Sequence, residues 1–143
     1  MAKQRWTRLA SLLGVGLCLA VSCTGTRLAV QPGPGRLEAL VGLEAVTYVL
    51  THRPGPCVLI YHSPRCEFCR AVLRAMTSAL PDLGPQAVIY TLDIDGNPDV
   101  RDAMGIGPVP VVVFLRDGVE VRRWRLYRPG FVVRAGLRRF FAP

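Results

Sequence analysis

Apolar positions along the chain switch between helical spacing and continuous runs, which predicts alternating helices and strands. Leu and Val recur at helical spacing over residues 36–51, and we expect a first helix there. Residues 57–61 form a continuous apolar run, as expected for a strand that is covered on both faces. The elements predicted next are a helix over 66–80, a strand over 87–92 and a short helix over 97–104.

The C-terminal part of the chain predicts a hairpin and a last helix. Strands over 110–115 and 119–126 are joined by Arg116-Asp117-Gly118, a turn sequence, and a helix begins at Pro129. Alternating β and α elements followed by β-β-α predict an α/β fold, with a central mixed β-sheet that has helices on both faces.

The first 35 residues differ in kind from the rest. Lys3, Arg5 and Arg8 precede thirteen uncharged residues, 9–21, and small and polar residues follow, which is the pattern of a secretory signal. This apolar run is shorter than the roughly 20 residues that span a bilayer. The predicted organisation has three segments: a signal peptide or lipoprotein leader over 1–22, a Pro/Gly-rich linker over 23–35 and one domain over 36–143.

The leader ends in Ala20-Val21-Ser22-Cys23, which resembles the lipobox of bacterial lipoproteins. In a lipobox, the Cys receives lipid after cleavage, so we expect Cys23 to be lipidated. Plain secretion after cleavage behind Ser22 and an uncleaved N-terminal anchor are the alternatives. All three place the domain outside the cytoplasm, in the periplasm or at the cell surface.

Cys66-Glu67-Phe68-Cys69 has the arrangement that thiol–disulfide exchange needs. The segment opens a predicted helix, so Cys66 lies at a helix N-terminus, where unpaired N–H groups and the dipole stabilise a thiolate. Cys69 lies one turn further on, close enough to close a disulfide. We therefore expect Cys66 to attack and Cys69 to resolve. A zinc half-site and a purely structural disulfide are the alternatives.

Neighbouring side chains are candidates for tuning this pair. Arg65 lowers the pKa of a Cys66 thiol by attraction, whereas Glu67 raises it by repulsion. His62 titrates near neutral pH and is a candidate for proton transfer, with a packing or solvent-exposed role as the alternative. Cys57 begins a strand and is expected to be a buried, small apolar residue.

Three further segments follow the Cys pair, and with it they make the chain resemble the thioredoxin family over roughly residues 37–141. They are Leu92-Asp93-Ile94-Asp95-Gly96-Asn97-Pro98, Gly105-Ile106-Gly107-Pro108-Val109-Pro110 and Phe114-Leu115-Arg116-Asp117-Gly118. The resemblance implies a thioredoxin-like fold with four sheet strands, or five if residues 27–30 supply the first family strand. It also implies a monomeric thiol–disulfide oxidoreductase without a cofactor.

The resemblance also implies roles for the residues that precede the strand at 110–115. Pro110 is expected to follow a cis peptide bond and to face the Cys pair. Val109 is expected to offer its backbone to an extended substrate chain. The implied partners are protein thiols and disulfides and a membrane redox partner.

The chain departs from the family pattern beside the thiols. Arg65 stands where the family has an aromatic residue, Glu67-Phe68 where it has Gly-Pro, and Ile60 where it has a buried carboxylate. These departures favour a specialised extracytoplasmic oxidoreductase. The alternatives are a copper-handling protein that uses Cys66, Cys69 and His62, and a thioredoxin-like module that only binds partners.

The formal charge of +8 is concentrated near the C-terminus, where most residues after 115 that are charged are Arg. A basic face attracts anionic lipid or an acidic partner, or is simply solvated. Nucleic acid is not an expected partner, because no recognition motif or aromatic platform accompanies the charge. We expect no resident metal.

Overall fold

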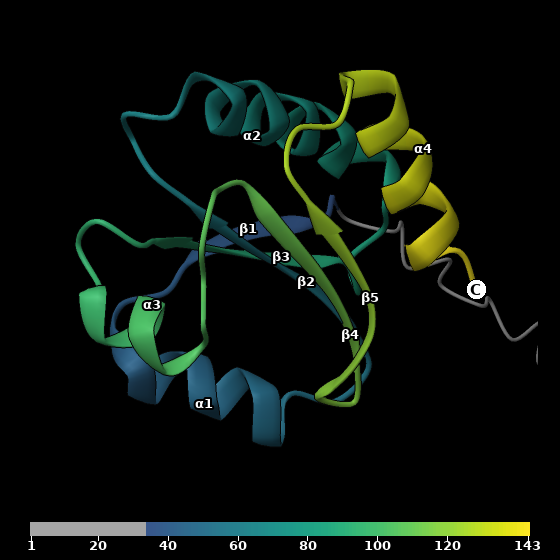
Figure 1. Cartoon of the computed structure of the whole chain (residues 1–143). Coiled ribbons are helices and arrows are strands. Elements are labelled where there is room, and N and C mark those ends of the chain that lie inside the picture. Colours follow the sequence, from purple (N-terminus) through teal and green to yellow (C-terminus); the bar gives the residue numbers. More distant parts are fainter. Residues whose placement is uncertain (1–33) are drawn as a thin grey trace, which may run out of the picture. The chain divides into compact units, whose positions relative to one another are not determined.

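The computed structural model describes residues 34–143; the predicted leader, Cys23 and most of the linker lie outside them. Within this part of the chain, five strands form one mixed sheet in the order β1-β3-β2-β4-β5 (Figure 1). β1 and β2 run parallel to β3, whereas β4 is antiparallel to β2 and β5. The strands are β1 Arg36–Ala39, β2 Pro56–His62, β3 Val88–Asp93, β4 Val111–Arg116 and β5 Val119–Arg125. The predicted thioredoxin-like α/β fold is confirmed.

Helices cover both faces of this sheet (Figure 1). The helices are α1 Gly42–His52, α2 Glu67–Ala79, α3 Pro98–Ala103 and α4 Gly130–Phe141, with a 3₁₀ turn at Leu80–Asp82. Helices α1 and α3 lie on one face, and α2 and α4 on the other. Each helix in the described residues is too short or too polar to cross a membrane.

The central strand β2 is apolar on both sides because two separate cores meet on it. Val58 and Ile60 pack into the core beneath α2 and α4, whereas Leu59 and Tyr61 pack into the core beneath α1 and α3. Side chains alternate between the faces of a strand, so both faces need apolar residues. Burying each large apolar side chain contributes about 1.5–3 kcal/mol, and β2 contributes to both cores.

An aromatic cluster packs β5 and α4 against β4. The Phe114 ring on β4 meets Trp124 of β5 edge to face at 4.6 Å and Phe140 of α4 at 5.0 Å between centroids. Such pairs contribute about 0.5–1.5 kcal/mol beyond the buried area. The strand that follows the cis-proline loop is thereby held against the elements on either side of it.

The first element is a strand where we predicted the start of a helix. Arg36–Ala39 pairs with β3, and hydrogen bonds from Arg36 N to Ala87 O and from Leu40 N to Thr91 O, both 2.8 Å, extend the pairing. The helix begins only at Gly42, whose φ of 81° is not helical. Pairing with a neighbouring strand therefore overrides the helical spacing of Leu37 and Leu40. The first family strand lies here; residues 27–30, where we expected it, are outside the described part.

Candidate active site

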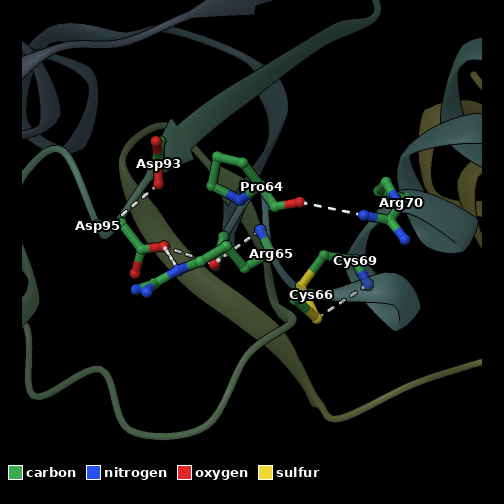
Figure 2. A network of polar contacts seen from close by, with 8 residues as sticks. Pro64, Arg65, Cys66, Cys69, Arg70, Asp93 and Asp95 are labelled. Carbon is green, nitrogen blue, oxygen red and sulfur yellow. Dashed lines mark hydrogen bonds and ion pairs between the residues drawn. A yellow bond between two sulfur atoms is a disulfide. The ribbon is translucent and has the colours of Figure 1, made fainter.

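Cys66 and Cys69 form a disulfide at the start of α2, with their Cα atoms 5.2 Å apart (Figure 2). Cys66 is the N-cap residue of α2, with an extended backbone, and the N–H of Cys69 donates to its sulfur at 3.1 Å. A free N–H of the first helical turn thus points at the Cys66 sulfur. This is the environment that favours a thiolate.

The two sulfurs differ in their access to solvent. Cys66 is half-buried, whereas Cys69 is 0% exposed. A substrate sulfur can reach Cys66 but not Cys69 while the helix is intact. The difference agrees with an attacking role for Cys66 and a resolving role for Cys69.

The loop that precedes β4 lies beside the exposed sulfur. The Val109–Pro110 bond is cis, as predicted. The sulfur of Cys66 lies 3.8 Å from the carbonyl oxygen of Val109, and a shallow pocket of about 300 Å³ joins Cys66 to Gly107, Pro108 and Val109. Within residues 34–143, the backbone of Val109 makes no hydrogen bond to other backbone groups. Its N–H and C=O are therefore free to pair with an extended chain.

Arg65 turns away from the sulfur that follows it in the sequence. Its Nε donates to Asp95 Oδ2 at 3.2 Å, and Figure 2 shows the guanidinium beside Asp95 on the side away from the disulfide. The hydrogen bond and charge of Asp95 raise the pKa of Arg65. A hydrogen bond from Ser63 and then one from Arg65 lower the pKa of Asp95. The sequence did not indicate that Ser63 and Asp95 belong to the site.

His62 lies at the end of β2 and is in register with Asp93 of β3. Its Nδ1 is buried and has no hydrogen-bond partner within the described residues. Burial lowers the pKa of His62, and the charges of Asp93 and Asp95 oppose this less strongly. Burial therefore favours the neutral form of His62.

A metal centre is not assembled in the described part of the chain. Residues 34–143 contain no group of three or more His, Cys, Asp or Glu side chains placed to hold a metal ion. The copper-binding alternative required Cys66, Cys69 and His62 to meet, and the structure does not bring them together as a ligand set.

Cys57 is fully buried in β2 and has no disulfide partner in the described residues. Burial raises the pKa of Cys57 to about 11, with Arg53 opposing the shift. Because only a thiolate reacts, Cys57 is inert at neutral pH. Its expected structural role agrees with this environment.

An exposed aromatic pair borders the disulfide on the helix side. Phe68 is 61% exposed, and its ring centroid lies 5.2 Å from that of Tyr127 in the segment after β5. The neighbouring Leu126 donates its N–H to Pro110 O at 3.0 Å. Sequence reasoning gave no reason to place Tyr127 at the site, because only the folded chain brings this segment to the Cys pair.

Comparison with known proteins finds no family model that matches the chain. Over 58 residues the chain is 33% identical to a thioredoxin of Chlamydia muridarum, an alignment that covers 41% of this chain. The chain spans about half of that relative, 53% of its length.

Solved structures of thioredoxins are similar in fold. The thioredoxin of Malassezia sympodialis matches with a TM-score of 0.64 at 17% identity, covering 78% of this chain and 95% of that one. The thioredoxin of Fasciola hepatica matches with a TM-score of 0.62 at 19% identity, covering 72% of this chain and 98% of that one. These likenesses show that the fold is thioredoxin-like, as the sequence predicted.

Proposed function

On the premise that the chain is a thioredoxin-like protein, we propose that it exchanges thiols and disulfides with protein substrates through Cys66 and Cys69. One observation carries the proposal: the half-exposed Cys66 sulfur lies at the N-terminus of α2, 3.8 Å from the Val109 carbonyl, with Cys69 buried behind it. An extended substrate that pairs with Val109 has its own sulfur next to Cys66.

Reduction of a substrate proceeds in two displacements. The Cys66 thiolate attacks one sulfur of the substrate disulfide, a mixed disulfide forms, and the other substrate sulfur leaves as a thiolate and takes up a proton. The Cys69 thiolate then attacks the Cys66 sulfur, which releases the substrate as a thiol. Two electrons pass from the Cys pair to the substrate, and the reverse sequence oxidises it.

The described contacts support both displacements. The N–H of Cys69 already donates to the Cys66 sulfur at 3.1 Å, so it stabilises negative charge there when the disulfide opens. The second step needs Cys69 close to Cys66, and the 5.2 Å between their Cα atoms satisfies this. Neither step requires a cofactor.

The catalytic claim is tested by insulin reduction with dithiothreitol. We expect the wild-type protein to precipitate insulin faster than dithiothreitol alone, and Cys66→Ser to remove the acceleration. Cys57→Ala is the matched control, because it removes a thiol that is buried away from the site. A wild-type rate equal to that of dithiothreitol alone would contradict exchange on protein substrates and leave the non-catalytic binding module as the alternative.

We further propose that the protein is exported and attached to a membrane through lipid on Cys23. Support comes from the sequence: three basic residues, an uncharged run over 9–21 and Ala20-Val21-Ser22-Cys23. A membrane redox partner would then supply or remove electrons outside the cytoplasm. Labelled palmitate should appear on the wild type and vanish in Cys23→Ala. Cys18→Ala is the control, because Cys18 lies inside the uncharged run, and this variant should retain the label. Incorporation that is unchanged in Cys23→Ala would exclude this attachment.

A further inference from the structure

The turn between β2 and α2 decides where the Cys66 sulfur lies. It consists of Ser63, Pro64 and Arg65, and the Cys66 N–H donates back to Ser63 O at 3.1 Å. Arg70 of α2 donates to Pro64 O at 3.3 Å (Figure 2). A contact that fixes the conformation of this turn therefore also fixes the positions of the Cys66 sulfur and of the charged side chain of Arg65.

Asp95, in the loop after β3, holds the turn through a single oxygen. Its Oδ2 accepts from Ser63 Oγ at 2.6 Å and from Arg65 Nε at 3.2 Å. The Ser63 hydroxyl, on a residue only 8% exposed, also accepts from the Arg65 backbone N–H at 3.2 Å. Asp95 therefore fastens both the side chain and the backbone of the residue before Cys66.

Asp95 is itself held in place by its own loop. Its N–H donates to Asp93 Oδ1 at 2.9 Å, and Asn97 Nδ2 donates to Asp93 O at 2.7 Å. Asn97 Oδ1 in turn accepts from Gly42 N at 2.7 Å, at the start of α1. The carboxylate thus has a fixed position from which it orients Arg65.

The orientation of the Arg65 side chain matters because this cation directly precedes Cys66 in the sequence. Other charged or titratable groups near the disulfide are Glu67 and Arg70 on α2, Arg101 on α3, His62 and Asp93 on the strand ends, and Tyr127 beside Phe68. The loop of Gly107, Pro108 and Val109 is uncharged. Among these groups in residues 34–143, Arg65 alone is both adjacent to Cys66 in the sequence and held away from its sulfur by an ion pair.

We propose that Asp95 is a positioning residue that, through Ser63 and Arg65, fixes the turn before Cys66 and holds the guanidinium charge away from its sulfur. The inference rests on the proposed exchange function, since it concerns the thiol that attacks. A thiolate without a nearby cation is less stabilised, which favours the disulfide form of the pair. Release of Arg65 then makes the pair a stronger oxidant.

The test is the pH profile of Cys66 alkylation by iodoacetamide in the reduced full-length protein, located by tandem mass spectrometry. Asp95→Asn keeps the shape and an acceptor for Ser63 but removes the charge that binds Arg65. We expect the midpoint to fall by about half a pH unit, about threefold more thiolate below the midpoint. We expect the reduction potential against glutathione to rise. Asp99→Asn, a carboxylate outside this network, is the matched control.

A second pair of variants separates positioning from the direct field of the carboxylate. Coulomb contributions add, so loss of the Asp95 charge alone would shift the midpoint equally with or without Arg65. The pair is Arg65→Gln and the double variant Arg65→Gln/Asp95→Asn. If Asp95 acts by holding Arg65, the shift of the midpoint caused by Asp95→Asn should fall to less than half when Arg65 is already Gln. Equal shifts in the two backgrounds, or no shift in either, would overturn the proposal. Because alkylation needs no protein substrate, these outcomes are independent of the insulin result.

Discussion

The sulfur of Cys66 and the carbonyl oxygen of Val109 lie 3.8 Å apart, although 43 positions separate the two residues. The contact joins the first turn of α2 to the loop that enters β4. Within residues 34–143, the backbone of Val109 has no backbone hydrogen-bond partner, so it shares one surface with the half-buried sulfur of Cys66. An extended segment of a substrate protein can therefore pair its backbone with Val109 and place its sulfur next to Cys66.

The hairpin between β4 and β5 allows a direct test of packing around a glycine. Gly118 and Gly55 have nearly the same backbone, with φ of 76° and 75°. A Cβ on Gly118 would overlap the backbone carbonyl of Leu50, whereas a Cβ on Gly55 meets nothing within 4 Å. Gly55→Ala should lower the free energy of unfolding by about 1–2 kcal/mol through its left-handed backbone alone.

Gly118→Ala should lower it by about 1–3 kcal/mol more, because a backbone group cannot rotate aside. Urea denaturation of the two variants beside the wild type measures the difference. Equal losses for the two alanines would show that the hairpin relaxes away from α1 at little cost.

His62 should make the protein less stable in acid. Burial lowers the pKa of His62 in the folded chain below its ordinary value of 6.5. Below that pH the unfolded chain binds a proton at His62 that the folded chain does not, so the free energy of unfolding falls as the pH drops. One proton limits this slope to about 1.4 kcal/mol per pH unit.

The variant His62→Phe should have a shallower decline below pH 6.5 than the wild type, since Phe cannot take up a proton. Urea denaturation in steps from pH 7.5 to 5 gives both slopes. If the two slopes coincide, His62 takes up its proton equally in the folded and unfolded chains.

The sequence predicted those parts of the fold in which burial is strong. The run over residues 57–61 is apolar because both sheet faces are covered there, so β2 was recognisable. β1 was not, because a four-residue edge strand buries little and its hydrogen bonds go to a partner far along the chain. The helical spacing of Leu37, Leu40 and Leu43 therefore predicts a helix that begins earlier than the observed start at Gly42.

The candidate site likewise has residues that the sequence predicts and residues that it does not. Cys66 and Cys69 follow from a motif at recognisable spacing, and the cis bond before Pro110 follows from the resemblance to the thioredoxin family. The partner of Arg65 does not, because Asp95 lies 30 positions away and no pattern gives the direction of a side chain. We had expected Arg65 to act on the thiolate, and the structure shows its charge paired elsewhere.

The most direct measurement of the central claim is the trapping of mixed disulfides. Cys69→Ser removes the buried thiol that resolves the intermediate, so this variant should accumulate protein adducts that dithiothreitol releases and that join through Cys66. In Cys66→Ser the thiol that remains of the pair is Cys69, which is buried, so this variant should form no adducts through the pair. Non-reducing electrophoresis measures the adducts of both variants, and mass spectrometry of the linked peptides identifies the cysteine that carries them. Adducts on Cys66→Ser in place of Cys69→Ser, or on neither variant, would contradict exchange through an exposed Cys66 and a resolving Cys69.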